Sequence, residues 1–249
     1  MTAGKNFLVT GAGRDIGRAI ALALGGPGTL GVIHYANSAE GAESTLAGLR
    51  SLGGDGIAIQ ADLCDEHQVT QFLEDVAAAL LGRQLDTLVL NAASTAATPM
   101  GDAPIDALKS MLAVNVLAPQ RIVDGLSIHL SDGASIVAMS IAAVRQVFSP
   151  DFAFFSATKA AVDVLIKGWA VGLGSRGIRA NAVAPGVVDV NFRADLLKDP
   201  GFRAALVGAT ALGRPGQIGD VADVVAFLAS DKARWVTGQT IDASGGWKL

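Results

Sequence analysis

The sequence predicts an α/β protein in which helices cover both faces of one doubly wound parallel sheet, and three features predict it. Short apolar runs alternate with longer segments of helical period along the whole chain, as in repeated βαβ units. The run at residues 87–90 is almost wholly apolar, which is typical of a strand covered on both faces. A glycine-rich turn also lies between the first apolar run and the first helical segment.

Each expected element follows from a local pattern. The first helix carries Ile16, Ile20 and Leu24 on one face, and Gly53 and Gly54 end the second. The expected strands cover residues 7–10, 30–35, 56–60, 87–90, 134–139, 178–183 and 239–242. The expected helices cover residues 16–24, 39–52, 66–81, 156–172 and 221–229, with a further long helix within residues 105–126. Alternation to the end of the chain predicts one Rossmann-like domain over residues 1–249.

Composition excludes several classes of protein. The chain has 249 residues, of which 51% are hydrophobic and 17% charged, enough for one sizeable core. A net charge of −4 argues against a nucleic-acid-binding surface, and a single cysteine, Cys64, rules out an internal disulfide framework. No apolar run reaches the roughly 18 residues that cross a bilayer, and no signal peptide precedes the first strand. We therefore expect a cytoplasmic protein that does not bind membranes.

The turn after the first strand has the character of a phosphate-binding loop. It contains Gly11, Gly13, Arg14, Asp15, Ile16 and Gly17. Glycines let the backbone approach a pyrophosphate closely, and the helix that follows presents free N–H groups and a positive dipole to the anion. Dinucleotide binding is therefore favoured over a plain tight turn.

From this turn onward the sequence resembles the short-chain dehydrogenase/reductase family, over about residues 6–247, and is closest in style to its 3-oxoacyl-carrier-protein reductases. Gly11 and Gly17 match the first and last glycines of the family's Thr-Gly-x-x-x-Gly-x-Gly turn, whereas Asp15 replaces the middle one. Asp15 is expected to cap the first helix. The segment Asn91, Ala92, Ala93 resembles the family's Asn-Ala-Gly motif. Residues 237–246 resemble its last strand and turn.

The resemblance implies a nicotinamide coenzyme, and local residues favour NADP(H) over NAD(H). NAD-binding proteins usually place an acid at the end of the second strand, where this chain has Asn37 and Ser38. Arg14 is suited to pair with a ribose 2′-phosphate, with a solvated turn residue as the alternative. The resemblance further implies coenzyme contacts at Asp62, Leu63, Lys159, Pro185, Gly186 and Val188.

The catalytic positions that the resemblance implies are only partly occupied by the family's residues. Lys159 and Asn115 match the lysine and the asparagine. Phe155 stands at the position of the tyrosine that exchanges a proton with the substrate, and Ile141 stands at that of the serine that holds the carbonyl. A shift of one residue would bring Ser140 into the serine position instead. The only tyrosine, Tyr35, is expected on the adenosine side, so an ordinary ketoreductase mechanism is disfavoured.

The substrate side is expected to be apolar. Phe152, Phe154 and Val190 are expected to approach it, with core packing as the alternative for each and the favoured interpretation for Phe154. Val190 stands where the family usually has a threonine that bonds the nicotinamide. The segment 192–207 resembles the family's substrate lid, where Arg193, Lys198 and Arg203 meet either an anionic substrate or solvent. No His, Cys or acid cluster has metal-ligand spacing.

Three functions remain open at this stage. The first is an NADP-dependent oxidoreductase that works on an apolar small molecule without a tyrosine phenol. The second is a catalytically silent coenzyme-binding protein, such as a subunit of a hetero-oligomer with an active homologue. The third is a non-redox enzyme, a cyclase or dehydratase, that reuses the pocket. By analogy with the family we expect a homodimer or homotetramer, with an alanine-rich helix face in the contact at Ala157, Ala160, Ala161 and Val164.

Overall fold

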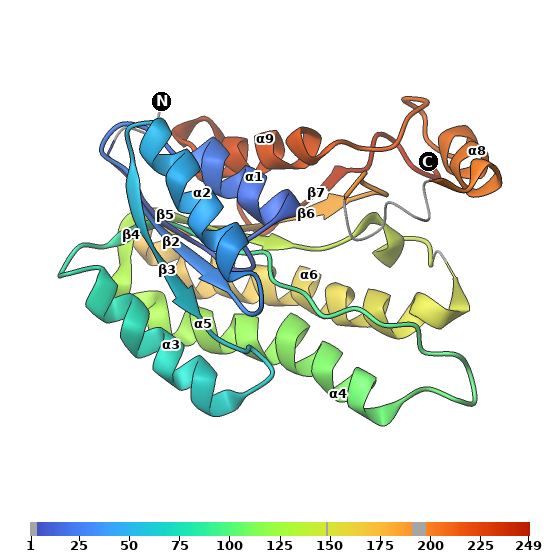
Figure 1. Ribbon diagram of the computed structural model, residues 1–249, viewed down its shortest axis with the longest axis horizontal. Helices are drawn as coiled ribbons and strands as arrows, with labels where there is room; N and C mark the ends of the chain where they lie inside the picture. The colour runs from blue at the N-terminus through green and yellow to red at the C-terminus, as the bar shows by residue number, and fades with distance from the viewer. Residues whose placement is uncertain (1–3, 148, 191–197) are drawn as a thin grey trace.

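The computed structural model describes residues 4–147, 149–190 and 198–249 and confirms the expected parallel α/β fold (Figure 1). Seven parallel strands form one sheet in the order β3-β2-β1-β4-β5-β6-β7. The strands are β1 Asn6–Val9, β2 Leu30–Tyr35, β3 Asp55–Gln60, β4 Leu85–Leu90, β5 Leu130–Met139, β6 Arg179–Pro185 and β7 Thr240–Ala243. All seven coincide with expected strands to within a few residues at their ends.

Helices cover both faces of the sheet, as Figure 1 shows. On one face lie α1 Asp15–Leu24, α2 Ala39–Ser51 and α9 Ile218–Ala229, and on the other lie α3 Glu66–Ala79, α4 Ile105–Leu112, α5 Ala118–Leu126 and α6 Ala153–Leu173. Alternating side chains of β1 explain this: Phe7 and Val9 join the core under α1, whereas Leu8 joins the core under α3 and α5. Successive strand residues point to opposite faces, so one short strand contributes to two cores.

The long helix expected within residues 105–126 is present but contains an irregular turn. α4 continues through a π-helical segment, Ala113–Leu117, directly into α5. Single π-turns inside α-helices often occur at functional sites. This one places Asn115 in a buried position.

Short helical segments complete the connections. They are the 3₁₀ turns Ser127–His129, Ala142–Val144, Pro150–Phe152, Gly174–Arg176 and Asp231–Ala233, and the helix α8 Pro200–Gly208. α8 lies in the segment expected to form the substrate lid, whereas Phe192 and Arg193 of that segment lie outside the described residues. Lys198 and Arg203 are both exposed.

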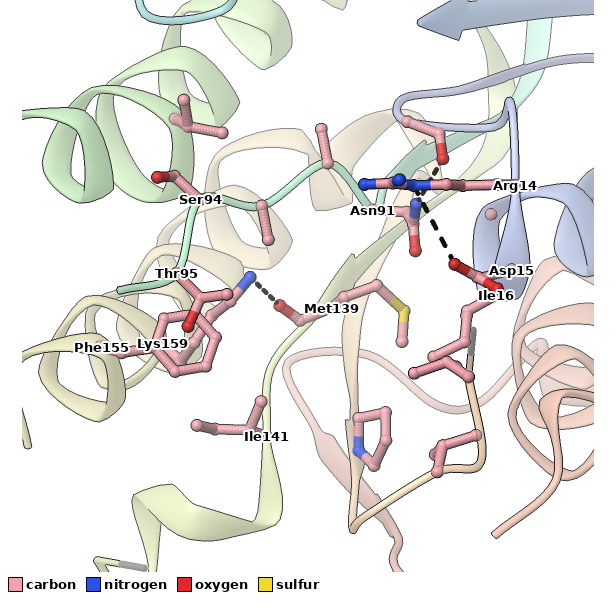
Figure 2. A pocket seen from close by; sticks show the side chains of 18 of the residues that line it. Arg14, Asp15, Ile16, Asn91, Ser94, Thr95, Met139, Ile141, Phe155 and Lys159 are labelled. Carbon is pink, nitrogen blue, oxygen red and sulfur yellow. Dashed lines mark hydrogen bonds and ion pairs between the residues drawn. The ribbon is translucent and has the colours of Figure 1, made fainter. Parts of the chain in front are cut away.

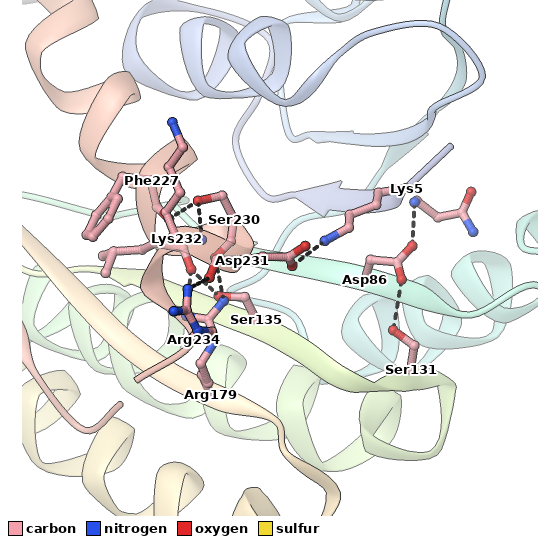
Figure 3. A network of polar contacts seen from close by, with 12 residues as sticks. Lys5, Asp86, Ser131, Ser135, Arg179, Phe227, Ser230, Asp231, Lys232 and Arg234 are labelled. Carbon is pink, nitrogen blue, oxygen red and sulfur yellow. Dashed lines mark hydrogen bonds and ion pairs between the residues drawn. The ribbon is translucent and has the colours of Figure 1, made fainter. Parts of the chain in front are cut away.

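The amino-terminal ends of the strands are fixed by a polar network far from the strands' carboxyl ends (Figure 3). The Arg179 guanidinium and the Ser135 hydroxyl both donate to the Leu228 carbonyl, at 2.7 and 2.9 Å. The Asp86 carboxylate accepts from the Asn6 backbone N–H and the Ser131 hydroxyl, at 2.8 and 2.9 Å. Because buried polar groups need partners, this network serves the stability of the fold.

Among the helices that the structure describes, none is long and apolar enough to span a membrane. The cytoplasmic location expected from the sequence stays a prediction.

Candidate active site

A cleft of ≈ 950 Å³ opens along the carboxyl-terminal edge of the sheet. The edge where neighbouring crossovers run in opposite directions is the usual ligand site of a doubly wound sheet. We call the part at the ends of β1–β4 the nucleotide half; it is lined by Gly11, Gly13, Arg14, Asp15, Ile16, Gly17, His34, Tyr35, Ala36, Asn37, Ser38, Asp62, Leu63, Cys64, Asn91, Ala92, Ala93, Ser110 and Val114. We call the rest the catalytic half; it is lined by Ser94, Thr95, Met139, Ser140, Ile141, Ala142, Ala143, Phe152, Phe155, Ser156, Lys159, Pro185, Gly186, Val187, Val188, Val190, Phe202 and Trp247. Every residue expected to contact the coenzyme therefore lies in this one cleft, and those roles stay predictions.

Two glycines of the turn in the nucleotide half, Gly11 and Gly17, have no room for a side chain. Gly11 adopts a φ of +66°, which favours glycine. A Cβ on Gly17 would lie 2.2 Å from the Gly11 carbonyl oxygen and 2.6 Å from Asn91 Nδ2. The Asn91 amide in turn donates to the carbonyls of Thr10 and Gly11, at 2.9 and 3.1 Å. Backbone N–H groups at the start of α1 are thus left beside an open cleft, which fits the pyrophosphate of a dinucleotide.

His34 holds this turn against two strands, a contact that the sequence did not reveal. The Gly11 N–H donates to His34 Nδ1 at 3.0 Å, and His34 Nε2 donates to the Ala61 carbonyl at 3.1 Å. Burial lowers the pKa of His34 to about 4, so the ring is neutral near pH 7 and both nitrogens are used. A histidine within an apolar strand is the signal that could have indicated a buried, hydrogen-bonded ring.

Arg14 and Asp15 differ from the expected arrangement. α1 begins at Asp15 with Arg14 as its N-cap residue and no side-chain capping bond from it, so the N-cap position expected for Asp15 is wrong. Asp15 has a φ of +46°, a left-handed conformation that Asp tolerates better than most residues. Its carboxylate favours the positive helix end and lies 4.0 Å from Arg14 Nε. Arg14 remains 71% exposed beside the cleft (Figure 2).

Lys159 is the charged centre of the catalytic half. Its Nζ donates to the Met139 carbonyl at 2.8 Å (Figure 2). Burial lowers the pKa of Lys159 to about 8, and Asp163 partly opposes that shift. The same Nζ lies 6.0 Å from the centroid of the Phe155 ring. A buried ammonium therefore faces a hydrocarbon ring where the family resemblance implies a phenol.

Hydroxyl groups in the catalytic half are few and unevenly placed. Ile141 lines the cleft, whereas the Ser140 hydroxyl is buried and has no hydrogen-bond partner among the described residues. The Ser156 hydroxyl, on the same face of α6 as Lys159, is likewise buried and unpartnered. Tyr35 lies in the nucleotide half, as expected.

Asn115 lies behind the cleft wall, where its side chain is fully used. Its Oδ1 accepts from the Ser94 N–H at 2.9 Å, and its Nδ2 donates to the Ser94 carbonyl and to the Thr158 hydroxyl, at 2.8 and 3.0 Å. Asn115 thereby joins the π-turn to the loop after β4 and to α6. Its side chain positions the wall that carries Lys159, and the catalytic role implied by resemblance stays a prediction.

No group of three metal-ligating side chains occurs in the described part of the chain. The described cleft combines the glycine cradle of the nucleotide half with the buried Lys159 of the catalytic half. These features define the class: a dinucleotide-binding α/β protein with a buried lysine at the catalytic end of its cleft.

Comparison with known proteins gives the family. Residues 11–248 match the family model described as enoyl-(acyl carrier protein) reductase. The chain is 40% identical to an uncharacterized oxidoreductase of Methylorubrum extorquens over 98% of this chain and 97% of that protein. It is 39% identical to the 3-oxoacyl-[acyl-carrier-protein] reductase FabG of Staphylococcus aureus, over 97% of each chain. The protein belongs to the short-chain dehydrogenase/reductase family.

Solved structures of similar proteins support the same family assignment. The angucycline C-6 ketoreductase LanV with bound NADP superposes with a TM-score of 0.92 at 37% identity, covering 100% of this chain and 97% of that one. A blue fluorescent protein from a metagenomic library, in complex with NADPH, gives a TM-score of 0.91 at 31% identity and covers 99% of each chain.

Proposed function

We propose that this protein is an NADP(H)-dependent oxidoreductase that acts on a neutral, apolar small molecule. Its catalytic half would do so without a tyrosine as proton donor. One observation carries the proposal: the turn that fits a dinucleotide and the buried Lys159 share a cleft in which Phe155 faces the lysine. The coenzyme would supply or accept a hydride. The NADP-bound and NADPH-bound structures of similar proteins support this choice of coenzyme, as does Arg14.

The chain's own residues would have separate tasks. The Gly11–Gly17 turn would bind the pyrophosphate, and Arg14 would bind a ribose 2′-phosphate together with Ser38 and Asn37. Lys159, close to Phe155, would orient the nicotinamide end and place a positive charge beside the reacting carbon, where it stabilises developing negative charge. Without a phenol, the final proton comes from water or from Lys159 itself.

The loss of two hydroxyls, at Phe155 and Ile141, favours a second candidate, a silent coenzyme-binding subunit. Assembly would use the α6 face at Ala157 and Val164, both of which are exposed, in a homodimer, a homotetramer or a pair with an active homologue.

The test is NADPH oxidation, followed by absorbance, with a panel of ketones, conjugated enones and imines. We expect turnover of at least one conjugated substrate and little or none of simple ketones. NADPH binding without turnover of any substrate, together with co-elution with an active homologue on a sizing column, would support the silent subunit instead.

A further inference from the structure

Aromatic side chains are concentrated in the catalytic half of the cleft. The chain has nine Phe, three Trp and one Tyr, which is 5% of its residues. Four of these rings line this one region, and each comes from a different segment: Phe152 from a 3₁₀ turn, Phe155 from α6, Phe202 from α8 and Trp247 from the chain's last residues. Four rings that line one half of the cleft, here called the aromatic lining, suit contacts with a flat ring.

Packing holds part of this aromatic lining in place. Trp247 is 4% exposed and belongs to a small buried cluster with Ala142 and Leu206, against which Phe202 packs. The Trp247 backbone N–H donates to the Ser244 hydroxyl at 3.1 Å. The Lys248 ammonium lies 4.9 Å from the indole centroid. A guest would therefore meet a largely preformed surface, which lowers the entropic cost of binding.

Charged side chains are almost absent from the lining of the catalytic half. Among the described residues of the catalytic half, Lys159 alone has a titratable side chain, and its remaining neighbours include Ile141, Val187 and Val190. Arg145, which follows the cleft-lining residues Ala142 and Ala143, is paired with Asp242. Among the described residues that line the catalytic half, an anionic group would therefore meet one cation, the buried Lys159, while the exposed Lys248 lies against Trp247.

The missing proton donors restrict the chemistry further. Hydride addition to a simple ketone produces an alkoxide, which needs a proton from a positioned acid. Hydride addition to a quinone or to an aryl-conjugated enone leaves a phenolate or an enolate instead. A phenol has a pKa near 10, so its anion is a far weaker base than an alkoxide. The Lys159 ammonium stabilises this anion, and water or Lys159 then delivers the proton.

We infer that the natural substrate class is a neutral, planar, fused-ring aromatic carbonyl compound, a quinone or an aryl enone, whose reduction leaves a delocalised anion. The inference rests on the proposed function. For a quinone, an O–H bond forms as a dihydronicotinamide C–H bond breaks, and both electrons of that bond pass to the substrate. The coenzyme would thereby be oxidised and the quinone reduced to a hydroquinone monoanion, which would take up one proton to give the hydroquinone.

Three probes of matched size separate the parts of this inference. Naphthoquinone is aromatic and gives a phenolate, tetralone is aromatic and gives an alkoxide, and decalone is saturated and gives an alkoxide. All measurements use a Cys64→Ala background, because quinones add to thiols and Cys64 is an exposed thiol that lines the cleft.

Binding is measured by calorimetry with and without NADP⁺. We expect naphthoquinone and tetralone to bind about tenfold more tightly than decalone, since each stacked ring contributes roughly two- to tenfold. Phe202→Leu should reduce this preference about threefold, whereas Phe227→Leu, the same change on the outer face of α9, should leave it unaltered. Equal binding of tetralone and decalone would overturn the aromatic part of the inference.

Turnover is measured with NADPH. We expect naphthoquinone to be reduced and tetralone and decalone to be inert. Reduction of tetralone as fast as naphthoquinone would overturn the delocalised-anion part. Aromatic preference in binding with no turnover of naphthoquinone would overturn the delocalised-anion part and leave the aromatic preference of the pocket standing. Failure of the proposed oxidoreductase function itself would instead appear as no turnover across the whole panel of ketones, enones and imines.

Discussion

The two halves of the cleft differ in how their polar groups are used. In the nucleotide half, the glycine turn is bonded by His34 and Asn91, and Thr10 accepts from the backbone N–H groups of Asn91 and Ala92. In the catalytic half, the hydroxyls of Ser140 and Ser156 lack partners and hydrocarbon faces Lys159. The proposed function therefore places coenzyme binding and proton transfer in different halves of the cleft, the first on backbone shape and the second on side chains.

Lys159→Met tests whether the ammonium of the catalytic half is buried, as the difference between the two halves of the cleft implies. The pKa of Lys159 is about 8 in the folded protein and 10.5 as its ordinary value. The unfolded chain thus binds more protons between these pH values, and the free energy of unfolding rises with pH across that window. Between pH 7 and 10.5, we expect the free energy of unfolding of the wild type to rise by on the order of 3 kcal/mol relative to that of Lys159→Met. Urea unfolding at several pH values measures it, and parallel curves would contradict the burial.

His34→Asn tests the nucleotide half in the opposite pH range. The pKa of His34 falls from 6.5 to about 4 on folding, so the unfolded chain binds more protons between pH 4 and 6.5. On acidification through that window, the free energy of unfolding of the wild type should fall by on the order of 3 kcal/mol. The asparagine variant retains an acceptor for the Gly11 N–H, and its free energy of unfolding should fall much less. Equal acid sensitivity of the two proteins would refute the neutral histidine.

Gly17→Ala places a methyl group against the Gly11 carbonyl in the coenzyme turn. We expect NADPH affinity, measured by coenzyme fluorescence, to fall by about a hundredfold, the size of effect that overpacking strain produces. Gly172→Ala in α6, where nothing lies within 4 Å of the added methyl, is the matched control and should leave affinity unchanged. Equal affinities in both variants would mean that the turn does not bind the coenzyme.

Arg14→Ala sharpens the account of coenzyme choice. We expect NADPH binding to weaken about tenfold, since a partly exposed, charge-assisted bond to phosphate is lost. NADH binding should be nearly unaffected, because NADH has no 2′-phosphate. The ratio of the two dissociation constants is the measurement, and a proportional loss for both coenzymes would contradict the assignment.

Much of the fold was predictable because its signals are local. The alternation of Phe7, Leu8 and Val9 between two cores follows from the period of a strand, and Gly11 and Gly17 mark a turn that only glycine fits. The π-turn at Asn115 was not predictable, since its side-chain partners, Ser94 and Thr158, lie far along the chain.

The site was predictable where its residues directly follow successive strands, because such residues meet at the carboxyl-terminal edge of a parallel sheet. Lys159, Phe155 and Ile141 were expected in one cleft and are found there. The contact from His34 to Gly11 and the left-handed conformation of Asp15 were missed. Both depend on how two strand ends meet, which no local pattern of residues records.

The central claim is that the coenzyme cradle remains functional while the groups that deliver a proton to a simple ketone have been replaced. The most direct measurement is NADPH-dependent reduction of tetralone by wild type and by the Phe155→Tyr, Ile141→Ser double variant. The account predicts no detectable reduction by wild type and clear reduction by the double variant, a gain of at least about a hundredfold. Efficient reduction by wild type, or no gain in a double variant that still binds NADPH, would contradict it.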